Sequence, residues 1–433
     1  MAVAKTNFGQ RLAFILLIIM LALLPFHAFI YTWIKSYFWT DSWTIIIHVW
    51  KEILVIVLGL LGIGEVISKR SQLPHGRGNA LAYLYLGLAL LHFALFTGDN
   101  VFQAAFGLRT AAVFVILFLV VQLFNWTKEN FRQLLLVALV VGSITALFGI
   151  LQTTVLPANF LTNFGYSQVV SSWDPQGNLP AYHQLGDAAN TVRAQATFAQ
   201  PNRFAAYLLL IFFPLFFFAT KTKPGWRRQL AQVASLVVLF ALFFTYSRGA
   251  WLSLALALAY FFWRKYGQRI SRRSVIIGIT VLLLVGGAIL AGLPQSQQLQ
   301  ETILRQGSTS AHVQRTLSAI QVGLQHPFGL GLGQAGGTSM RFDPTGQGFL
   351  TENFYLQILV EQGYLSFLAF LFLIVYLVLH LLKEPQKTYY LGYSFLALAL
   401  ANLFTETFDD TAVVLSTFAL LGIAWQQLLP VRS

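Results

Sequence analysis

Residues 12–34 read LAFILLIIMLALLPFHAFIYTWI, a run without a single Asp, Glu, Lys or Arg. A helix needs about 20 mostly apolar residues to cross the roughly 30 Å hydrocarbon core of a bilayer. Lys5 and Arg11 precede the run, but no small-residue cleavage site follows it. The run is therefore predicted to be a retained first membrane span and not a signal peptide.

Apolar runs of similar character continue along the chain, which is 57% hydrophobic and only 10% charged. A soluble globule of 433 residues needs more polar surface than that. We expect one integral membrane domain over residues 1–433, all-α and polytopic, with about twelve transmembrane helices. The further spans are predicted near 43–64, 79–97, 109–126, 132–156, 203–220, 229–245, 249–263, 275–293, 364–382, 389–407 and 411–428.

The basic residues fix the expected orientation. The formal net charge is +13, but the Lys and Arg residues fall in short loops between apolar runs, which is membrane topology and not a nucleic-acid footprint. Most of them lie in loops on the side of the N-terminus, and cationic loops resist translocation. Both ends are therefore predicted in the cytoplasm. The chain has no cysteine, which excludes a disulfide framework and a thiolate metal site.

Two connections on the opposite side are long, near 157–202 and 294–363, and connections of that length are usually functional or disordered. In the second, Val313, Leu317, Ile320 and Leu324 recur at three- and four-residue spacing, which predicts an amphipathic helix over 311–325. We expect this helix to lie along the membrane surface or to cap a cavity.

The cations predicted on the outer side are nearly all arginines. Arginine grips two phosphate oxygens with a planar fork, whereas lysine offers a point charge. The alternative is that these arginines reach to lipid headgroups or pair with acids. The outer cations are Lys35, Arg109, Arg193, Arg203, Arg248, Arg305, Arg315 and Arg341.

The sequence TENFYLQILVEQGY (351–364) places Glu352 and Asn353 directly before a predicted span. A carboxylate at the border of membrane and water can act as a general base if burial and nearby arginines tune it. The alternative is an acid favoured by the helix dipole, with Thr351 as the cap. The preceding HPFGLGLGQAGG (326–337) contains G-x-G-x-x-G but lacks the strand of a dinucleotide fingerprint. Its glycines instead indicate a turn or a close backbone approach.

Further polar groups lie inside or beside spans. His48, Lys51 and Glu52 fall on one face of the second predicted span, either as a proton relay or as a self-satisfied Lys–Glu pair. Asp409 and Asp410, with Glu406, are outer acids that could bind a divalent ion, but the sequence supplies no further ligand. We expect no metal and no cofactor.

Four segments together resemble the O-antigen ligase and O-antigen polymerase superfamily over roughly residues 130–382. They are RAQATFAQPNRFAAYLLL (193–210), FFTYSRGAWLSLALAL (243–258), QHPFGLGLG (325–333) and TENFYLQILVEQGYLSFLAFL (351–371). The resemblance implies a membrane glycosyltransferase with a GT-C-like fold. It would act on glycans carried on undecaprenyl diphosphate, outside the inner membrane of a bacterium, without nucleotide sugars.

The resemblance also implies roles for individual residues. Arg193 and Arg248 match the arginines that hold the donor diphosphate, and Arg203 lies beside the first. Glu352 stands where the ligases usually have histidine, followed by a matching Asn353, and is the expected catalytic base. Asn353 and Tyr355 are the expected contacts to the acceptor glycan.

The change from histidine to glutamate favours a polymerase that adds oligosaccharide repeats to a glycan acceptor, inverting the anomeric centre without a metal. One alternative is a ligase that moves finished glycan onto lipid A-core or another acceptor. Another is a transporter of a small anion such as bicarbonate, with the outer arginines as a selectivity ring and His48, Lys51 and Glu52 as a proton path.

Overall fold

The computed structural model describes residues 8–37, 41–68, 70–98, 100–168, 179–184, 192–267, 306–343 and 348–428. The predicted span 275–293 and Arg305 lie outside these residues. The helices are α1 (Phe8–Leu23), α2 (His27–Tyr37), α3 (Asp41–Ile67), α4 (Arg77–Leu95), α5 (Val101–Val121), α6 (Lys128–Thr154), α7 (Pro201–Lys221), α8 (Trp226–Phe244), α9 (Arg248–Tyr266), α12 (Gln306–Gln325), α13 (Gly336–Phe342), α14 (Phe354–Leu381), α15 (Leu391–Ala401) and α16 (Thr411–Leu428).

Short elements complete the described chain. Three 3-10 helices are η1 (Leu24–Phe26), η2 (Phe160–Phe164) and η4 (Thr407–Asp409), and β1 (His183–Gln184) pairs antiparallel with β2 (Val192–Arg193). Pro25, at the start of η1, separates α1 from α2. Side-chain caps begin several helices: Asn100 accepts from Gln103 N before α5, and Thr127 forms a capping box with Asn130 before α6.

Nine helical segments in the described part are long and apolar enough to cross a membrane. The helices α9 and α15 also fall on predicted spans, although α15 is short, so eleven of the twelve predicted spans coincide with helices. The nine segments are Phe8–Tyr37, Ile46–Ile67, Arg77–Leu95, Val101–Val121, Lys128–Thr154, Pro201–Lys221, Trp226–Phe244, Phe354–Leu381 and Thr411–Leu428.

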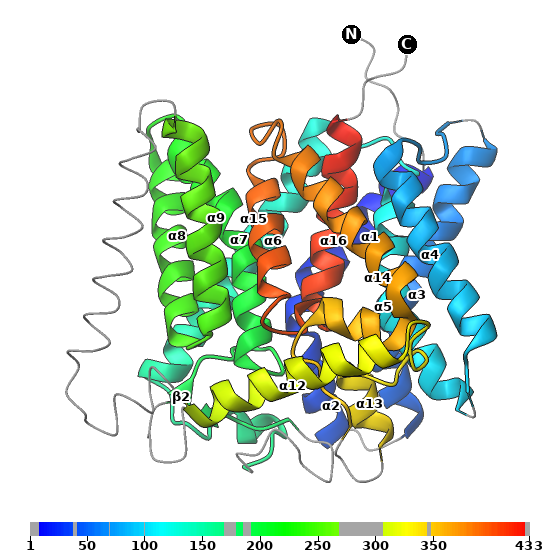
Figure 1. Ribbon diagram of the computed structural model, residues 1–433. Helices are drawn as coiled ribbons and strands as arrows, with labels where there is room; N and C mark the ends of the chain where they lie inside the picture. Colours follow the sequence, from blue (N-terminus) through cyan, green and yellow to red (C-terminus); the bar gives the residue numbers. More distant parts are fainter. Residues whose placement is uncertain are drawn as a thin grey trace.

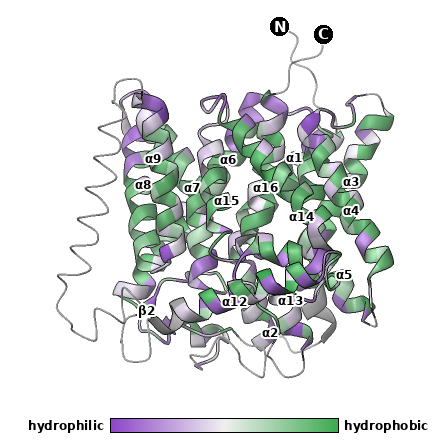
Figure 2. Ribbon diagram, in the orientation of Figure 1, coloured by the Kyte–Doolittle hydropathy of each residue, from purple (hydrophilic) through white to green (hydrophobic). Residues whose placement is uncertain are grey.

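An apolar belt surrounds the molecule between two polar ends (Figure 2). Large apolar side chains on the outside of the bundle are exposed, among them Ile56 at 61%, Leu91 at 54% and Phe372 at 59%. Exposed apolar surface on this scale needs lipid around it. The chain is therefore a multi-pass membrane protein.

Inside the bundle, small residues let helices approach closely. A Cβ on Gly422 of α16 would lie 2.3 Å from Val121 Cγ2 of α5, and one on Gly142 of α6 would lie 2.7 Å from Ile211 Cγ1 of α7. Helix pairs in membranes use such residues because apolar lipid gives little hydrophobic drive for association. The helices α5, α7 and α16 form the centre of the bundle.

The first and last described helices meet at one face of the bundle. The backbone N–H of Asn125 donates to Gln10 Oε1 in α1, and the Asn125 amide donates to the carbonyl of Arg70. Gln426, near the end of α16, donates to the carbonyl of Phe124. The start of α1 and the end of α16 therefore share a face (Figure 1), as the topology prediction requires. The cytoplasmic identity of this face stays a prediction.

At the opposite face, here called the outer face, α12 runs across the ends of the spanning helices, with α2, α13 and the small sheet beside it (Figure 1). The predicted amphipathic helix is confirmed as α12. Val313 and Leu317 of α12 are exposed by 52% and 60%, so its apolar side points away from the protein. Ala311 and Ser318 line a cavity on its other side. The helix thus covers a cavity, one of the two positions expected for it, and its place at the membrane surface stays a prediction.

The helix α14 begins at Phe354, earlier than the predicted residue 364. Asn353, and not Thr351, is its cap: the Asn353 side chain accepts from Tyr355 N and Leu356 N. The first turns were not predicted as part of a span because they carry polar residues, which the fold buries. Gly363 has a positive φ of 73° and kinks the helix, leaving room for the carbonyl of Pro327.

The glycine-rich loop at residues 326–337 fills that kink. Gly329, Gly331, Gly333 and Gly336 all have positive φ, which confirms the predicted turns. The loop also approaches α5 closely, since a Cβ on Gly107 would lie 2.2 Å from Gly333 N. The backbone of this loop therefore lies close to the neighbouring helices α5 and α14.

Candidate active site at the outer face

Arg193 is held by the first residues of α7 and the turn before α9. Its Nε donates to the carbonyl of Thr245 at 2.9 Å, and its Nη2 donates to Asn202 Oδ1 at 2.9 Å. The strand β2 positions it, because Ala194 N donates to the carbonyl of Phe244. The guanidinium is almost fully buried. Arg193 therefore joins the two family motifs 193–210 and 243–258 in space.

Arg248 is the first residue of α9 and follows a tight turn in which Tyr246 has a φ of 51°. The start of α9 packs against the segment between α15 and α16, since a Cβ on Gly249 would lie 2.8 Å from Phe404 Cβ. We call residues 402–410 the α15–α16 loop. Arg248 thus lies where the YSRGAW turn meets this loop.

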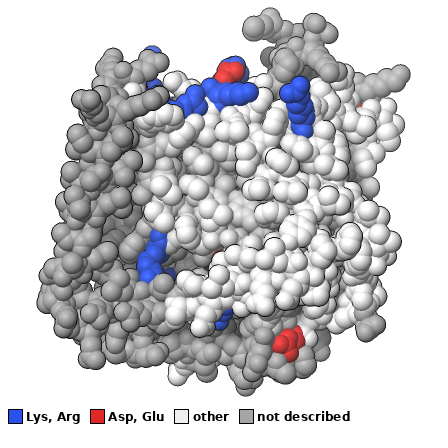
Figure 3. Space-filling model, in the orientation of Figure 1, with Lys and Arg blue, Asp and Glu red and all other residues white. Residues whose placement is uncertain are grey.

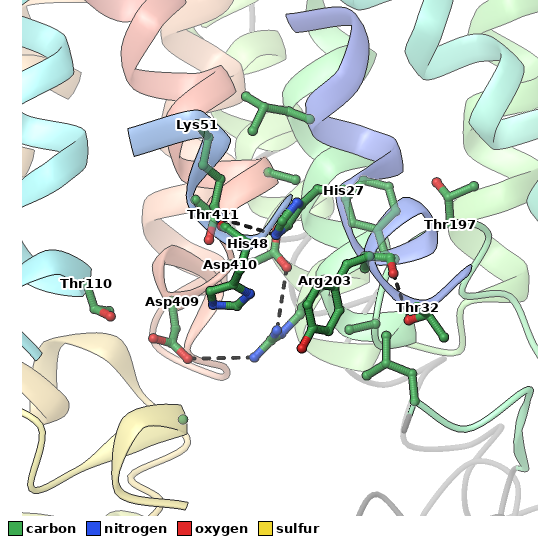
Figure 4. Close-up of a pocket in the computed structure, with 18 of the residues that line it drawn as sticks. His27, Thr32, His48, Lys51, Thr110, Thr197, Arg203, Asp409, Asp410 and Thr411 are labelled. Atoms are coloured by element: carbon green, nitrogen blue, oxygen red, sulfur yellow. Dashed lines mark hydrogen bonds and ion pairs between the residues drawn. The ribbon is translucent and has the colours of Figure 1, made fainter. Parts of the chain in front are cut away.

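Arg203, in the first turn of α7, bridges the other end of the same loop. Its Nη2 lies 3.6 Å from Asp409 Oδ2, and its Nη1 lies 3.7 Å from Asp410 Oδ2 (Figure 4). Burial raises the pKa of Asp409 above its usual range, and Arg203 opposes that shift. The two outer aspartates are thus arginine partners.

Glu352 lies immediately before the cap of α14, with a φ of 55°. A positive φ is uncommon for a residue other than glycine, and such strain often accompanies a functional position. Its carboxylate forms an ion pair with Arg315 of α12, and its Oε2 lies 3.4 Å from His312 Nδ1. The surrounding ion pairs orient this carboxylate.

Asn353 and Tyr355 are tied into the fold beside Glu352. The Asn353 amide donates to the carbonyl of Leu403 at 3.1 Å while its oxygen caps α14. Tyr355 is buried, and its hydroxyl donates to the carbonyl of Ala399 at 2.9 Å. Both residues therefore anchor α14 to α15 and the α15–α16 loop, and their contact with an acceptor stays a prediction.

Glu406 connects the α15–α16 loop to the segment that precedes α14. Its Oε1 accepts from Thr351 Oγ1 at 2.7 Å, from Thr351 N at 3.0 Å and from Glu352 N at 3.1 Å. Burial raises the pKa of Glu406 to about 7, and the nearby carboxyl of Asp409 adds to the rise. Glu406 fixes the backbone of Glu352 from within the loop that also holds Arg203.

A cavity of about 280 Å³ opens at the outer face between α2, α3, α5, α7, α13 and α16. Arg203, Lys51 and His48 line it together with Asp409 and Asp410 (Figure 4). Two members of the predicted trio, His48 and Lys51, thus line a cavity, and Glu52 lies behind them: Lys51 Nζ lies 3.5 Å from Glu52 Oε2, and Arg109 of α5 also pairs with Glu52. This is an ion-paired cluster larger than the predicted Lys–Glu pair.

A second and larger cavity, of about 570 Å³, lies under α12 and is lined by Arg315, Phe349 and Leu350 among others. Arg315 connects this space to Glu352 through the ion pair. The lining residues of the two cavities include neither Arg193 nor Arg248. Figure 3 shows basic side chains in a hollow of the outer half and along the opposite edge of the molecule. The predicted site residues are therefore distributed around the α15–α16 loop.

The sequence marked Glu406 only as a possible metal ligand and Arg109 and Arg341 only as outer cations, and it did not mark His27 at all. Their contacts run between residues far apart in the chain, such as Arg341 Nη1 with His48 Nε2 at 3.2 Å. A signal for Glu406 was present, because an acid in a short outer loop between two spans is costly to leave unpaired. Burial lowers the pKa of His183, in β1, to about 4.

Residues 233–371 match the protein-family model described as O-antigen ligase. No curated protein matches the chain. The matched part contains Arg248, the glycine-rich loop and Glu352, whereas Arg193 and Arg203 precede it. This family implies a membrane enzyme that ligates or polymerises glycans. Residues 233–371 are therefore similar to the O-antigen ligase family, which confirms the resemblance to the O-antigen ligase and polymerase superfamily.

Proposed function

We propose that the protein is a glycan polymerase of the bacterial inner membrane. It transfers oligosaccharide from an undecaprenyl-diphosphate donor to a hydroxyl of a glycan acceptor at the extracytoplasmic side. Supporting this are the family match, the concentration of arginines at the outer face and the carboxylate of Glu352 among them. The GT-C-like fold is part of the same proposal.

The observation that carries the proposal is the α15–α16 loop. Glu406 in this loop accepts from the backbone N–H of Glu352, while Asp409 and Asp410 at its end hold Arg203. One short loop thus fixes the proposed base and one proposed phosphate ligand relative to each other. Catalysis by positioned charge needs such a preorganised frame.

The reaction follows from these groups. The acceptor oxygen attacks the anomeric carbon, and the bond between that carbon and the diphosphate oxygen breaks. The electron pair of this bond goes to the diphosphate, whose charge the guanidinium groups of Arg193, Arg203 and Arg248 stabilise. Glu352 takes the proton of the acceptor hydroxyl. A single displacement inverts the anomeric centre and requires neither a metal nor a second carboxylate.

Asn353 and Tyr355 complete the proposal as acceptor-side residues. Both lie at the start of α14 directly after Glu352. The Tyr355 ring would pack against sugar C–H faces only if an acceptor approaches along α14. Their existing bonds to Leu403 and Ala399 mean that substitution of either one also disturbs the α15–α16 loop.

A ligase is the second candidate, and the description of the matching family favours it. The two reactions differ in what accumulates when the gene is deleted. Loss of a polymerase leaves single-repeat glycans on the lipid carrier, whereas loss of a ligase leaves long lipid-linked chains. Uptake of a small anion by the protein in liposomes, surviving Glu352→Gln, would instead favour a transporter.

The direct test uses purified protein, a lipid-linked oligosaccharide and detection of product length on gels. Arg193→Ala and Arg248→Ala are each expected to lower transfer about 100-fold or more, as loss of one preorganised donor does. Arg248→Lys is also impaired if two-pronged contact with phosphate matters. Arg227→Gln is the control, because Arg227 stacks on Trp226 at the opposite end of α8. Full activity of Arg248→Ala would remove that residue from the mechanism.

A further inference from the structure

The lining of the cavity of about 280 Å³ combines aromatic rings with hydroxyl and carboxylate groups. Such a mixture suits a sugar, because the C–H faces of a sugar pack on rings while its hydroxyls need hydrogen-bond partners. The volume lies near the lower end of the range for small-molecule sites, about 300–1,000 Å³, which suits one sugar ring. The rings belong to Tyr31, Phe106 and Phe198, and the oxygens to Thr110, Thr338, Thr411, Asp409 and Asp410.

Arg341 differs from the other arginines of this lining in its partners. In the described part of the chain, its guanidinium carbon lies 4.7 Å from the centroid of the Phe106 ring, and its Nη1 lies 3.2 Å from His48 Nε2. Neither partner is an acid. The other two arginines have acidic partners: Arg109 pairs with Glu52, and Arg203 pairs with Asp409 and Asp410. Arg341 therefore carries a positive charge that no described carboxylate balances.

The contacts of Arg341 leave N–H donors for a carboxylate. Packing on Phe106 uses the flat face of the guanidinium group, whereas its N–H donors lie in the plane of that group. The contact with His48 involves Nη1 alone. The side chain is exposed and lines the cavity, so it stands at the rim. The planar fork of an arginine matches the two oxygens of a carboxylate.

His48 supplies a second polar group beside Arg341. Arginine has donors only, so His48 Nε2 accepts from Arg341, which requires the neutral ring whose proton is on Nδ1. His48 Nδ1 is buried and has no hydrogen-bond partner among the described residues. A buried donor normally has an acceptor, and an oxygen of a sugar in this cavity supplies one. His48 and Arg341 together therefore favour a ligand rich in oxygen.

A single negative charge fits this lining better than a diphosphate does. Asp409 and Asp410 lie in the same lining as Arg341, and carboxylates repel a doubly charged group at short range. Arg203 lies 3.6 Å from Asp409 Oδ2, and a carboxylate has further lone pairs that accept from sugar hydroxyls. One arginine without an acidic partner thus balances one carboxylate, and the neighbouring acids serve hydroxyl groups.

We infer that this cavity binds one acidic sugar of the glycan, a hexuronic acid, whose carboxylate lies against Arg341 and whose ring packs on the aromatic part of the lining. The inference deepens the proposed function and rests on it. Arg203, a proposed ligand of the donor diphosphate, lines the same cavity, so the acidic sugar belongs to the donor glycan. Arg341 is then a specificity-determining residue that selects glycans with a uronic acid and takes no part in the exchange of bonds.

The test measures binding of small glycosides to the full-length protein in detergent by ligand-observed NMR. The probes are the methyl glycosides of glucuronic, galacturonic and mannuronic acid, each compared with its neutral parent hexoside. At least one uronide is expected to bind with a dissociation constant about tenfold or more below that of its parent. Equal affinity within all three pairs, or no binding of any uronide, would overturn the inference.

The variant that locates the carboxylate is Arg341→Gln, which removes the exposed guanidinium group and keeps the ion pairs of Arg203. Its affinity for the uronide is expected to fall about tenfold, to that of the parent hexoside, whose own affinity stays unchanged. A folding defect would instead weaken both. Arg227→Gln is the matched control, since it also removes an arginine from an aromatic ring, at the opposite face. Arg341→Gln protein that still prefers the uronide contradicts the inference. Inorganic diphosphate that binds through Arg341 more tightly than every uronide also contradicts it.

The outcome is separable from that of the proposed function. A protein that binds a uronide through Arg341 but transfers no glycan from any lipid-linked donor supports the acidic-sugar site and contradicts the polymerase. A protein that transfers a neutral glycan with the same donor KM as the matching uronic-acid glycan contradicts the acidic-sugar site and leaves the polymerase standing.

Discussion

Glu352 and Glu361 lie on either side of the first turns of α14, and their carboxylates differ in burial and in the groups that they contact. Glu361 is buried, and its Oε1 accepts from Gly333 N and Ala335 N, both at 3.2 Å. Glu352 is partly exposed and pairs with the side chains of Arg315 and His312. The first acid accepts hydrogen bonds from backbone amides, whereas the second pairs with ionisable side chains. The groups that each carboxylate contacts, and not the residue type, therefore distinguish the structural Glu361 from the proposed catalytic Glu352.

The largest effect expected from this contrast is on activity. Glu352→Gln keeps the shape of the side chain and its acceptor oxygen for Arg315 but cannot take a proton. Transfer is expected to fall about 100-fold or more, the usual contribution of a general base. The thermal unfolding temperature should stay within a degree or two of the wild type. Glu384→Gln is the control, because Glu384 forms an exposed pair with Lys387 elsewhere. A Glu352→Gln protein with normal turnover would end the assignment.

The next effect is on stability. Glu361→Ala leaves the buried N–H groups of Gly333 and Ala335 without their acceptor, which costs about 2–4 kcal/mol. Glu361→Gln retains an acceptor oxygen and is expected to unfold close to the wild-type temperature. Thermal unfolding followed by tryptophan fluorescence compares the two variants. If the alanine variant is as stable as the glutamine variant, Glu361 does not organise the glycine-rich loop.

The smallest effect concerns pH. The carboxyl of Glu406 has its pKa raised from 4.5 to about 7, so between these values the folded protein keeps a proton that the unfolded chain has lost. The contribution of Glu406 to the free energy of unfolding is fully present below pH 4.5 and is lost as the pH rises through 7. The loss is about 1–2 kcal/mol, reduced by partial exposure.

Glu406→Gln keeps an oxygen for the three donors but does not titrate. The unfolding temperature of the wild type should therefore fall more steeply between pH 5 and pH 8 than that of the variant. If the unfolding temperatures of the two proteins depend on pH in the same way, Glu406 does not change its protonation between pH 5 and pH 8, and the prediction is wrong.

Much of the fold could be predicted because the hydrocarbon of a membrane imposes a simple pattern. Long apolar runs located eleven helices, and the 3.6-residue spacing of Val313, Leu317 and Ile320 located α12. The start of α14 was not predicted, since Gln357 and Glu361 interrupt the apolar run. Their burial depends on the glycine-rich loop, which only the folded chain brings to them.

The sequence motifs marked candidate site residues one by one but not how these residues lie together in the fold. The motifs marked Arg193, Arg203, Arg248 and Glu352, which lie in three separate segments. Their common frame, the α15–α16 loop, carries no family motif, and its role rests on contacts such as that between Glu406 and Thr351. The cavity of Arg341 and Arg109 likewise joins α13 to α5, a proximity that no spacing in the sequence encodes.

The outward-facing leucines and valine of α12 have a consequence for how the protein meets its substrate. A helix seated in the lipid interface above a cavity lets a lipid-anchored molecule arrive sideways, by lateral diffusion within one leaflet. The protein and its lipid-anchored substrate then meet within the plane of the membrane. The reaction rate saturates with the number of carrier molecules per unit of membrane area. Turnover in reconstituted vesicles should accordingly follow the mole fraction of carrier in the bilayer and be insensitive to diluting the whole suspension with buffer.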